Sequence, residues 1–252
     1  MQAYSFDVYD IDGTLTIPGH DLWYLCTRTL SADKDLFETY VAEWKSEIHS
    51  GMDPFERSLT MMKRGLELLE DGVCSELVTR EVQRITSNLI DEGLVSREAI
   101  NFLKGRTQSG VRAALSTTNY HEGAVGFLQA LLLNGWIQQT ELEKIIVSGS
   151  RIDWSSRTVA HFNMGSNKVI GLMDDLGISK EEVKARICFA FGDDPLGSDR
   201  NILELSPYPY VIKNDKYRDL DLPDRVKLVT WPEVAAMSVA ELARMHTATA
   251  HK

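Results

Sequence analysis

Two aspartates separated by one residue follow an apolar, β-prone segment near the start of the chain, where Asp10 and Asp12 lie in the run YDIDGT of residues 9–14. The carboxyl end of a buried parallel strand is where ligand chemistry is usually placed. Two carboxylates there repel each other and are costly to desolvate unless a cation or a shared proton offsets the repulsion. A hard cation such as Mg²⁺ prefers oxygen ligands and often bridges to phosphate, so it suits this pair. The alternative is a strand that ends in a polar Asp-Gly turn.

A second polar group follows the predicted strand Val111–Thr117, which runs into Thr118 and Asn119 before a helix begins. A hydroxyl at this point, together with the free N–H groups of the helix, is suited to binding a phosphoryl oxygen. The alternative is that Thr118 or Asn119 is only the N-cap of the helix.

Lys168 stands in the first turn of a predicted helix, Asn167–Leu176. A cation there opposes the helix dipole and requires a negative partner nearby. A phosphoryl group or the aspartates would supply that partner, although surface lysines without such a role are common.

A group of acids follows the predicted strand Arg186–Phe191, beginning after Gly192. These acids are Asp193, Asp194 and Asp199. They are expected at the same sheet edge as the first two aspartates, where five carboxylates without a cation would repel one another strongly. A divalent metal ion resolves that repulsion, and Lys168 eases it further.

Strand and helix patterns alternate after residue 106, which predicts an α/β fold with a doubly wound parallel sheet. The further predicted elements are helix His121–Leu133, strand Lys144–Ser148, helix Asp199–Leu205, strand Tyr208–Ile212, strand Arg225–Val229 and a final helix from about Pro232 to Met245. Residues 149–163 are expected to form a β-hairpin that extends the sheet, with its turn near Asp153–Ser156.

The block between the first two strands has a helical pattern and is too long for an ordinary crossover. Its amphipathic segments are Lys34–His49, Pro54–Leu69 and Leu77–Leu89. We therefore expect residues 19–105 to form an inserted, all-helical cap domain over the carboxyl edge of the sheet. Residues 1–18 and 106–252 would then form the Rossmann-like core domain.

The composition of the 252-residue chain narrows the range of partners. A formal net charge of −10 argues against a nucleic-acid backbone or an anionic membrane surface. The three cysteines, Cys26, Cys74 and Cys188, are far apart and indicate neither disulfides nor a zinc site. No apolar run approaches the roughly 20 residues of a membrane span, and no secretory signal is evident, so a cytoplasmic protein is expected.

Taken in order, these residues resemble the haloacid dehalogenase (HAD) superfamily of phosphohydrolases, most nearly its phosphoserine-phosphatase-like branch with a helical cap. The resemblance implies that Asp10 is the nucleophile and a metal ligand, and that Asp12 is the general acid/base whose backbone carbonyl also ligates the metal. It further implies that Asp193 ligates the metal. Thr117 and Lys168 would bind the phosphoryl group.

This sequence departs from the family pattern at two points. The spacing between Asp193 and Asp199 is longer than usual, which leaves the roles of Asp194 and Asp199 open as supporting groups or metal ligands. Ser116 lies one residue before Thr117, so either hydroxyl is a candidate for the second motif. Thr118 remains a candidate phosphate-binding residue beside them.

The resemblance implies a Mg²⁺-dependent phosphatase that hydrolyses a small phosphomonoester metabolite through an aspartyl phosphate. A phosphotransferase or phosphomutase on the same fold is an alternative, as is a non-catalytic regulator that binds Mg²⁺ or a phosphorylated ligand. Dehalogenation is disfavoured because it needs neither a metal nor the second acid. The partner is expected to be the small phosphorylated metabolite alone, and the protein a monomer or homodimer.

Overall fold

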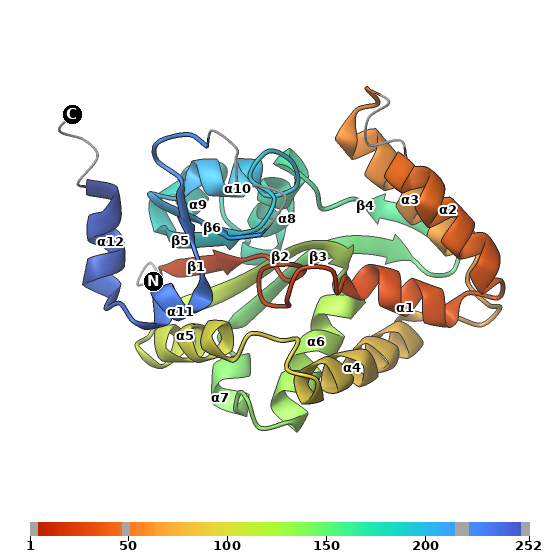
Figure 1. Ribbon diagram of the computed structural model, residues 1–252, viewed down its shortest axis with the longest axis horizontal. Coiled ribbons are helices and arrows are strands. Elements are labelled where there is room, and N and C mark those ends of the chain that lie inside the picture. Colours follow the sequence, from red (N-terminus) through yellow and green to blue (C-terminus); the bar gives the residue numbers. More distant parts are fainter. Residues whose placement is uncertain (1–4, 47–50, 215–221, 248–252) are drawn as a thin grey trace.

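The computed structural model describes residues 5–46, 51–214 and 222–247. Seven strands form one sheet in the order β4-β3-β2-β1-β5-β6-β7, in which all neighbours are parallel except β3 and β4 (Figure 1). The strands are β1 Phe6–Tyr9, β2 Arg112–Tyr120, β3 Ile145–Asp153, β4 Thr158–His161, β5 Ile187–Gly192, β6 Tyr208–Ile212 and β7 Lys227–Val229. The predicted doubly wound parallel sheet is therefore confirmed.

Strand β1 lies at the centre of the sheet, and all four of its residues are buried. Its last residue, Tyr9, pairs with Leu115 on β2 and with Phe191 on β5. The chain positions that follow these three residues must therefore meet at one edge. Asp10 follows β1, and the acidic segment that begins with Asp193 follows β5. The register of the strands therefore brings these two motifs together, although they are far apart in the sequence.

Helices cover both faces of the sheet (Figure 1). One face carries α8 Ser166–Leu176, α9 Lys180–Arg186 and α10 Arg200–Leu205. The other carries α5 Arg97–Gln108, α6 His121–Leu133, α7 Gln139–Leu142 and α11 Trp231–Ala235. The core between them is rich in aromatic side chains, and Tyr9, Phe191 and Tyr210 stack across the three neighbouring strands.

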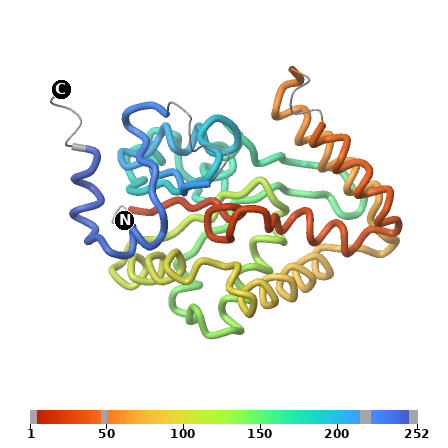
Figure 2. Tube along the Cα trace, in the orientation of Figure 1, coloured from red at the N-terminus to blue at the C-terminus, as the bar shows by residue number. Residues whose placement is uncertain are grey.

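The block between β1 and β2 is helical, as expected. It contains α1 Leu22–Leu30, α2 Lys34–Ser46, α3 Pro54–Glu67, α4 Ser75–Asp91 and α5. Helices α2 and α3 pair with each other and extend away from the sheet beside β4, whereas α4 packs against α6 and α5 against α11 (Figure 2). The last residues of the expected segment Lys34–His49 lie outside the described residues. The division into a cap of residues 19–105 and a core remains a prediction.

The expected hairpin is present, since β3 and β4 pair antiparallel around a turn at Asp153–Arg157. The prediction of a single final helix was wrong. Two helices are found instead, α11 and α12 Val239–Thr247, because Ser238 and Glu241 exchange hydrogen bonds that start a new helix. Helix α9, which the sequence analysis missed, begins with a similar exchange between Ser179 and Glu182. In the described part of the chain, every helix is too short or too polar to traverse a lipid bilayer.

Candidate active site

Asp10 lies directly after β1, where its backbone N–H donates to the carbonyl oxygen of Phe191 at 2.9 Å. Its side chain is only 7% exposed. The loop then turns back at Gly13, whose φ of +78° favours glycine. A Cβ at this position would also lie 2.3 Å from a carboxylate oxygen of Asp193. The turn after the first motif therefore needs glycine both for its backbone conformation and for the close approach of the second acidic segment.

Lys168 is fully buried and contacts two carboxylates. Its Nζ donates to Oδ1 of Asp10 at 2.7 Å and to Oδ1 of Asp199 at 2.6 Å. Burial alone would lower the pKa of Lys168, but the two carboxylates outweigh burial and raise it, so the side chain stays cationic. The negative partner that a lysine in the first turn of α8 requires is thus the aspartate cluster.

Asp199 is 3% exposed and has a defined position. Its Oδ1 accepts from Lys168, and its Oδ2 accepts from the backbone N–H groups of Asp193 and Asp194, both at 3.0 Å. Asp194 in turn accepts from the backbone N–H of Ser198 at 2.9 Å. Asp199 and Asp194 therefore hold the backbone of the loop after β5 in place, and Asp199 also holds Lys168. The side chain of Asp193 lines the cavity.

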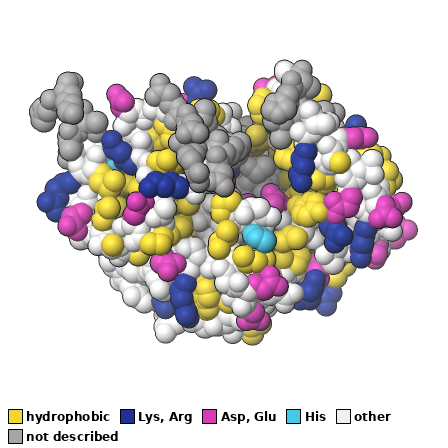
Figure 3. All heavy atoms as spheres, in the orientation of Figure 1, with side chains coloured by type: hydrophobic (Ala, Val, Ile, Leu, Met, Phe, Trp, Pro, Cys, Tyr) yellow, Lys and Arg dark blue, Asp and Glu magenta, His cyan; other side chains and the backbone are white. Residues whose placement is uncertain are grey.

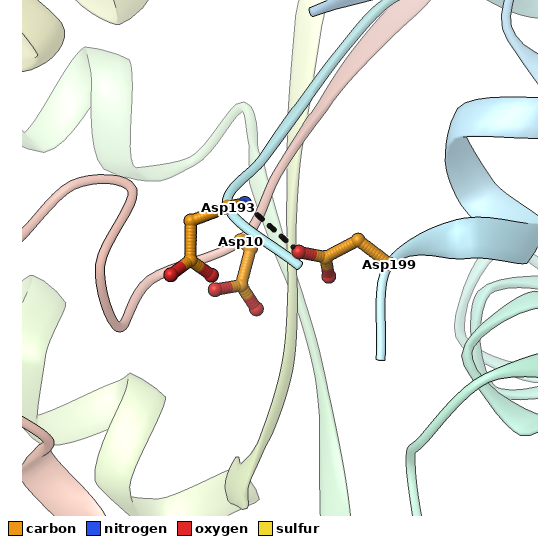
Figure 4. A group of neighbouring side chains, drawn as sticks. All are labelled: Asp10, Asp193 and Asp199. Atoms are coloured by element: carbon orange, nitrogen blue, oxygen red, sulfur yellow. Dashed lines mark hydrogen bonds between the residues drawn. The ribbon is translucent and has the colours of Figure 1, made fainter. Parts of the chain in front are cut away.

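Three carboxylates from separate segments meet at the sheet edge, and Figure 4 shows Asp10 and Asp193 side by side with Asp199 next to them. Each offers an oxygen within 4.8 Å of the others. The pKa of Asp10 is raised to about 7. Burial is the largest cause, the charge of Lys168 opposes it, and the charge of Asp199 adds to it. Burial, followed by the charges of Asp199 and Asp10, also raises the pKa of Asp193 well above its usual range.

This donor set fits a divalent metal ion. It offers hard oxygen atoms only, and one buried lysine does not balance the three carboxylates. The raised pKa values of Asp10 and Asp193 reflect burial above all, with a further contribution from the neighbouring carboxylates. Asp10 and Asp193 are the side chains that would hold Mg²⁺. Asp199 is geometrically close but is already bonded to Lys168 and two backbone N–H groups.

Asp12 directly precedes Gly13, and its Oδ1 accepts from the backbone N–H of Leu22 at the start of α1 at 2.8 Å. Burial raises the pKa of Asp12 well above its usual range, with further contributions from Asp21 and Asp10. A carboxyl group whose pKa is raised is suited to giving and taking a proton near neutral pH. Its position beside Asp10 therefore fits the predicted general acid/base.

The hydroxyl groups in the last residues of β2, which extends beyond its predicted end at Thr117 to Tyr120, lie where the sequence analysis expected a phosphate site. Thr117, Thr118 and Asn119 all line the same cavity as the aspartates. Neither Thr118 nor Asn119 is the N-cap of α6, since the N-cap is Tyr120 and no side chain caps it. The Thr118 hydroxyl and the Asn119 Nδ2 are buried without a hydrogen-bond partner among the described residues. Ser116 is buried one residue deeper in the strand.

Two asparagines that the sequence analysis missed support the site. Asn163 is fully buried, and its Nδ2 donates to the carbonyl oxygens of Thr117 at 2.9 Å and Ser148 at 2.8 Å. Asn214 donates to the backbone carbonyl of Asp193 at 3.2 Å. The signal was available for Asn214, because it follows the end of predicted strand Tyr208–Ile212 at the same sheet edge.

A cavity of about 520 Å³ opens in front of these groups, bounded by the sheet edge on one side and by α1, α2 and α3 on the other. Asp10, Asp12 and Asp193 lie at its polar end. In Figure 3 the surface is notched between the lobe at the right, which carries α2 and α3, and the body of the molecule. The polar end of the cavity therefore brings together oxygen ligands and unpartnered donors, and the ammonium group of Lys168 is bonded to Asp10 there.

Neither a protein-family model nor a curated protein matches this sequence. Solved structures do match it along nearly its whole length. A HAD family hydrolase from Salmonella enterica subsp. enterica serovar Typhi has a TM-score of 0.56 at 14% identity, covering 90% of this chain and 67% of that one. Phosphoserine phosphatase from T. onnurineus in complex with NDSB-201 has a TM-score of 0.54 at 15% identity, covering 93% and 94%. This chain has the HAD fold.

A third structure, cytosolic 5'-nucleotidase IIIB bound to cytidine, has a TM-score of 0.57 at 11% identity and covers 96% of this chain and 86% of that one. Identities this low establish the fold alone. They nevertheless agree with the resemblance drawn from four short motifs, which the strand order of this chain brings to a single sheet edge.

Proposed function

We propose that this protein is a Mg²⁺-dependent phosphatase that hydrolyses a small phosphomonoester through a phosphoryl group carried on Asp10. The observation that carries the proposal is the position of Asp10. This buried carboxylate lies at the polar end of the cavity beside Lys168, in a cluster with more carboxylates than cations. The HAD fold and phosphatases among the structural relatives support the assignment.

In the first step, one carboxylate oxygen of Asp10 attacks phosphorus. A bond forms between that oxygen and phosphorus, and the bond from phosphorus to the ester oxygen breaks. Asp12 donates its proton to the departing alkoxide, for which its raised pKa prepares it. Lys168 remains charged beside Asp10 and offsets negative charge on the phosphoryl oxygens.

In the second step, Asp12 takes a proton from water, and the water oxygen bonds to phosphorus. The bond between phosphorus and Asp10 then breaks and releases inorganic phosphate. The unpartnered donors of Thr118 and Asn119, and the hydroxyl of Thr117, line the cavity where the phosphoryl oxygens would lie. When bound, Mg²⁺ would neutralise the carboxylates of Asp10 and Asp193 and let the anionic substrate approach.

The test is phosphate release from a panel of small phosphomonoesters, measured with Mg²⁺ and with a chelator. We expect turnover of at least one substrate that the chelator abolishes and added Mg²⁺ restores. Transfer of the phosphoryl group back to a second substrate, without free phosphate, would instead identify a phosphotransferase. Binding of phosphomonoesters with no turnover by either route would contradict the proposal.

A further inference from the structure

The cavity at Asp10 has two chemically different ends. Its polar end carries the aspartates and the donors in the last residues of β2, as described above. The opposite wall is apolar and comes from α1, α2, α3 and the segment after β4. Its main side chains are Trp23, Trp44, Met61, Met62, Phe162 and Met164.

Contacts between elements hold this apolar wall in place. Trp23 packs against Phe37 with 5.8 Å between ring centroids, and Phe55 meets Phe162 edge-to-face at 5.2 Å. Met61 and Met62 are only 5% and 3% exposed. Methionine adapts its shape and contacts aromatic rings favourably through sulfur, so a wall of this composition is suited to a flat ring.

Trp44 adds a polar feature to the wall. It lines the cavity, and its indole N–H is buried without a hydrogen-bond acceptor among the residues that the structure describes. A buried donor without a partner is costly, and an acceptor supplied by a ligand would remove that cost. Among the described residues that line the cavity, the charged side chains are the aspartates and Lys45, and Lys45 is exposed.

We propose that the leaving group of the substrate is a flat, largely apolar, ring-bearing alcohol with a hydrogen-bond acceptor for the Trp44 N–H. This inference rests on the proposed phosphatase activity. Such a group would bury its ring against the methionines and aromatic side chains while its phosphoryl group reaches Asp10. The volume of about 520 Å³ lies within the ~300–1,000 Å³ typical of ligand pockets. A small zwitterionic alcohol would leave the apolar wall in water, so Trp44 is assigned as a specificity-determining residue.

The experiment compares 2-phenylethyl phosphate with propyl phosphate and O-phosphoserine. All three have alkoxide leaving groups, so differences in rate report recognition more than leaving-group chemistry. For the wild-type protein we expect kcat/KM for the ring-bearing ester to exceed that for propyl phosphate by roughly 10- to 100-fold. The variant Trp44→Ala should lose most of this preference, because its kcat/KM for the ring-bearing ester should fall far more than its kcat/KM for propyl phosphate.

A second variant, Trp44→Phe, keeps an aromatic ring but removes the N–H donor. For a ring-bearing phosphate that also carries a carbonyl or hydroxyl acceptor, we expect Trp44→Phe to lower kcat/KM roughly 3- to 10-fold. Trp136→Phe is the matched control, because Trp136 packs under Arg97 and lies outside the residues that line this cavity. It should leave the ratio of kcat/KM values unchanged.

Binding separates this inference from the proposed activity. Phosphonates resist hydrolysis, so 2-phenylethylphosphonate and propylphosphonate can be titrated calorimetrically against the wild-type protein with Mg²⁺. Tighter binding of the ring-bearing compound, lost in Trp44→Ala, supports the inference even if no phosphate ester turns over. Equal affinities would overturn it, and so would a preference for O-phosphoserine in turnover, while phosphate release would still uphold the proposed function.

Discussion

Two buried aspartates three residues apart, Asp7 within β1 and Asp10 directly after it, differ in how their negative charge is compensated. Asp7 is completely buried, and the guanidinium of Arg106 bonds both of its oxygens at 2.6 Å and 3.1 Å. The backbone N–H of Phe189 adds a third bond at 3.2 Å. Asp10 instead shares Lys168 with a second carboxylate and lies on the wall of the cavity.

The balance of charge around each carboxylate distinguishes the structural aspartate from the functional one in this molecule. The charge of Asp7 is matched one to one by Arg106, and its hydrogen bonds are complete within the protein. The charge around Asp10 is in excess, and burial above all, with a further contribution from Asp199, raises the pKa of Asp10 to about 7 although Lys168 lowers it. An imbalance of this kind at a cavity indicates that a cation or a reacting group belongs there.

The largest expected effect separates the two aspartates directly. Asp10→Asn should lower kcat more than ~10⁴-fold, because the nucleophile is removed, yet leave the melting temperature within a few degrees of wild type. Asp7→Asn should do the reverse. Breaking a buried ion pair costs ~3–5 kcal/mol, so its melting temperature should fall by roughly 10 °C while the folded protein keeps near-normal kcat. Thermal unfolding and phosphate release measured on the same samples provide the check.

Loss of both stability and activity in each of the two variants would contradict the assignment of a structural role to Asp7 and a catalytic role to Asp10. Wild-type turnover by Asp10→Asn would contradict it too, because the charge imbalance would then have no catalytic meaning.

A smaller effect follows from the raised pKa of Asp10 in the metal-free protein. The unfolded carboxyl loses its proton near pH 4, whereas the folded one holds it up to about pH 7. Between these values the folded state binds more protons, so the stability contribution is full below about pH 4 and is lost as the pH rises through about 7. With a chelator, the melting temperature should fall by roughly 5 °C between about pH 5 and pH 8.

Mg²⁺ should restore most of that loss at about pH 8 and have little effect near pH 5, where protons already neutralise the cluster. The variant Asp10→Asn removes one of the titrating groups of the cluster and should reduce the pH dependence. Equal stabilisation by Mg²⁺ at both pH values would contradict a metal site built on Asp10 and Asp193.

The smallest expected effect concerns the support of the phosphate site. Asn163→Asp would place an acceptor against the carbonyl oxygens of Thr117 and Ser148, which now receive its N–H groups. We expect the melting temperature to drop by roughly 5 °C and KM to rise about tenfold, because the donors in the last residues of β2 are displaced. Asn134→Asp is the matched control, since Asn134 bonds Ser87 and Ala130 far from the cavity and should not change KM. An unchanged KM for Asn163→Asp would make Asn163 purely structural.

Much of this site followed from strand ends. Three predicted strands each led into a polar group, and in a parallel sheet those ends meet at one edge, which is why Asp10, Thr118 and Asp193 could be grouped in advance. Thr117 was implied by the family resemblance. The lysine was also predictable, because a cation in the first turn of α8 needs a negative partner.

Other features depend on contacts that no local pattern encodes. The role of Asp199 rests on two backbone N–H groups that point at it only once the loop after β5 has folded. Asn163 acts on β2 from a segment 46 residues away, and the apolar wall comes together from separate elements. The break in the final helix had a local signal, Ser238 followed three residues later by Glu241, that the sequence analysis did not use.

The most direct test of the central claim is capture of the phosphoryl group on Asp10. Asp12→Asn should slow hydrolysis of the acyl phosphate by ~10²–10⁴-fold, so the phosphorylated protein should accumulate when the substrate has a good leaving group. Mass spectrometry after acid quenching should then find one phosphoryl group on the peptide that carries residue 10, sensitive to hydroxylamine and absent from an Asp10→Asn/Asp12→Asn double variant. A phosphoryl group on any other residue, or phosphate release from Asp12→Asn without covalent labelling, would contradict the account.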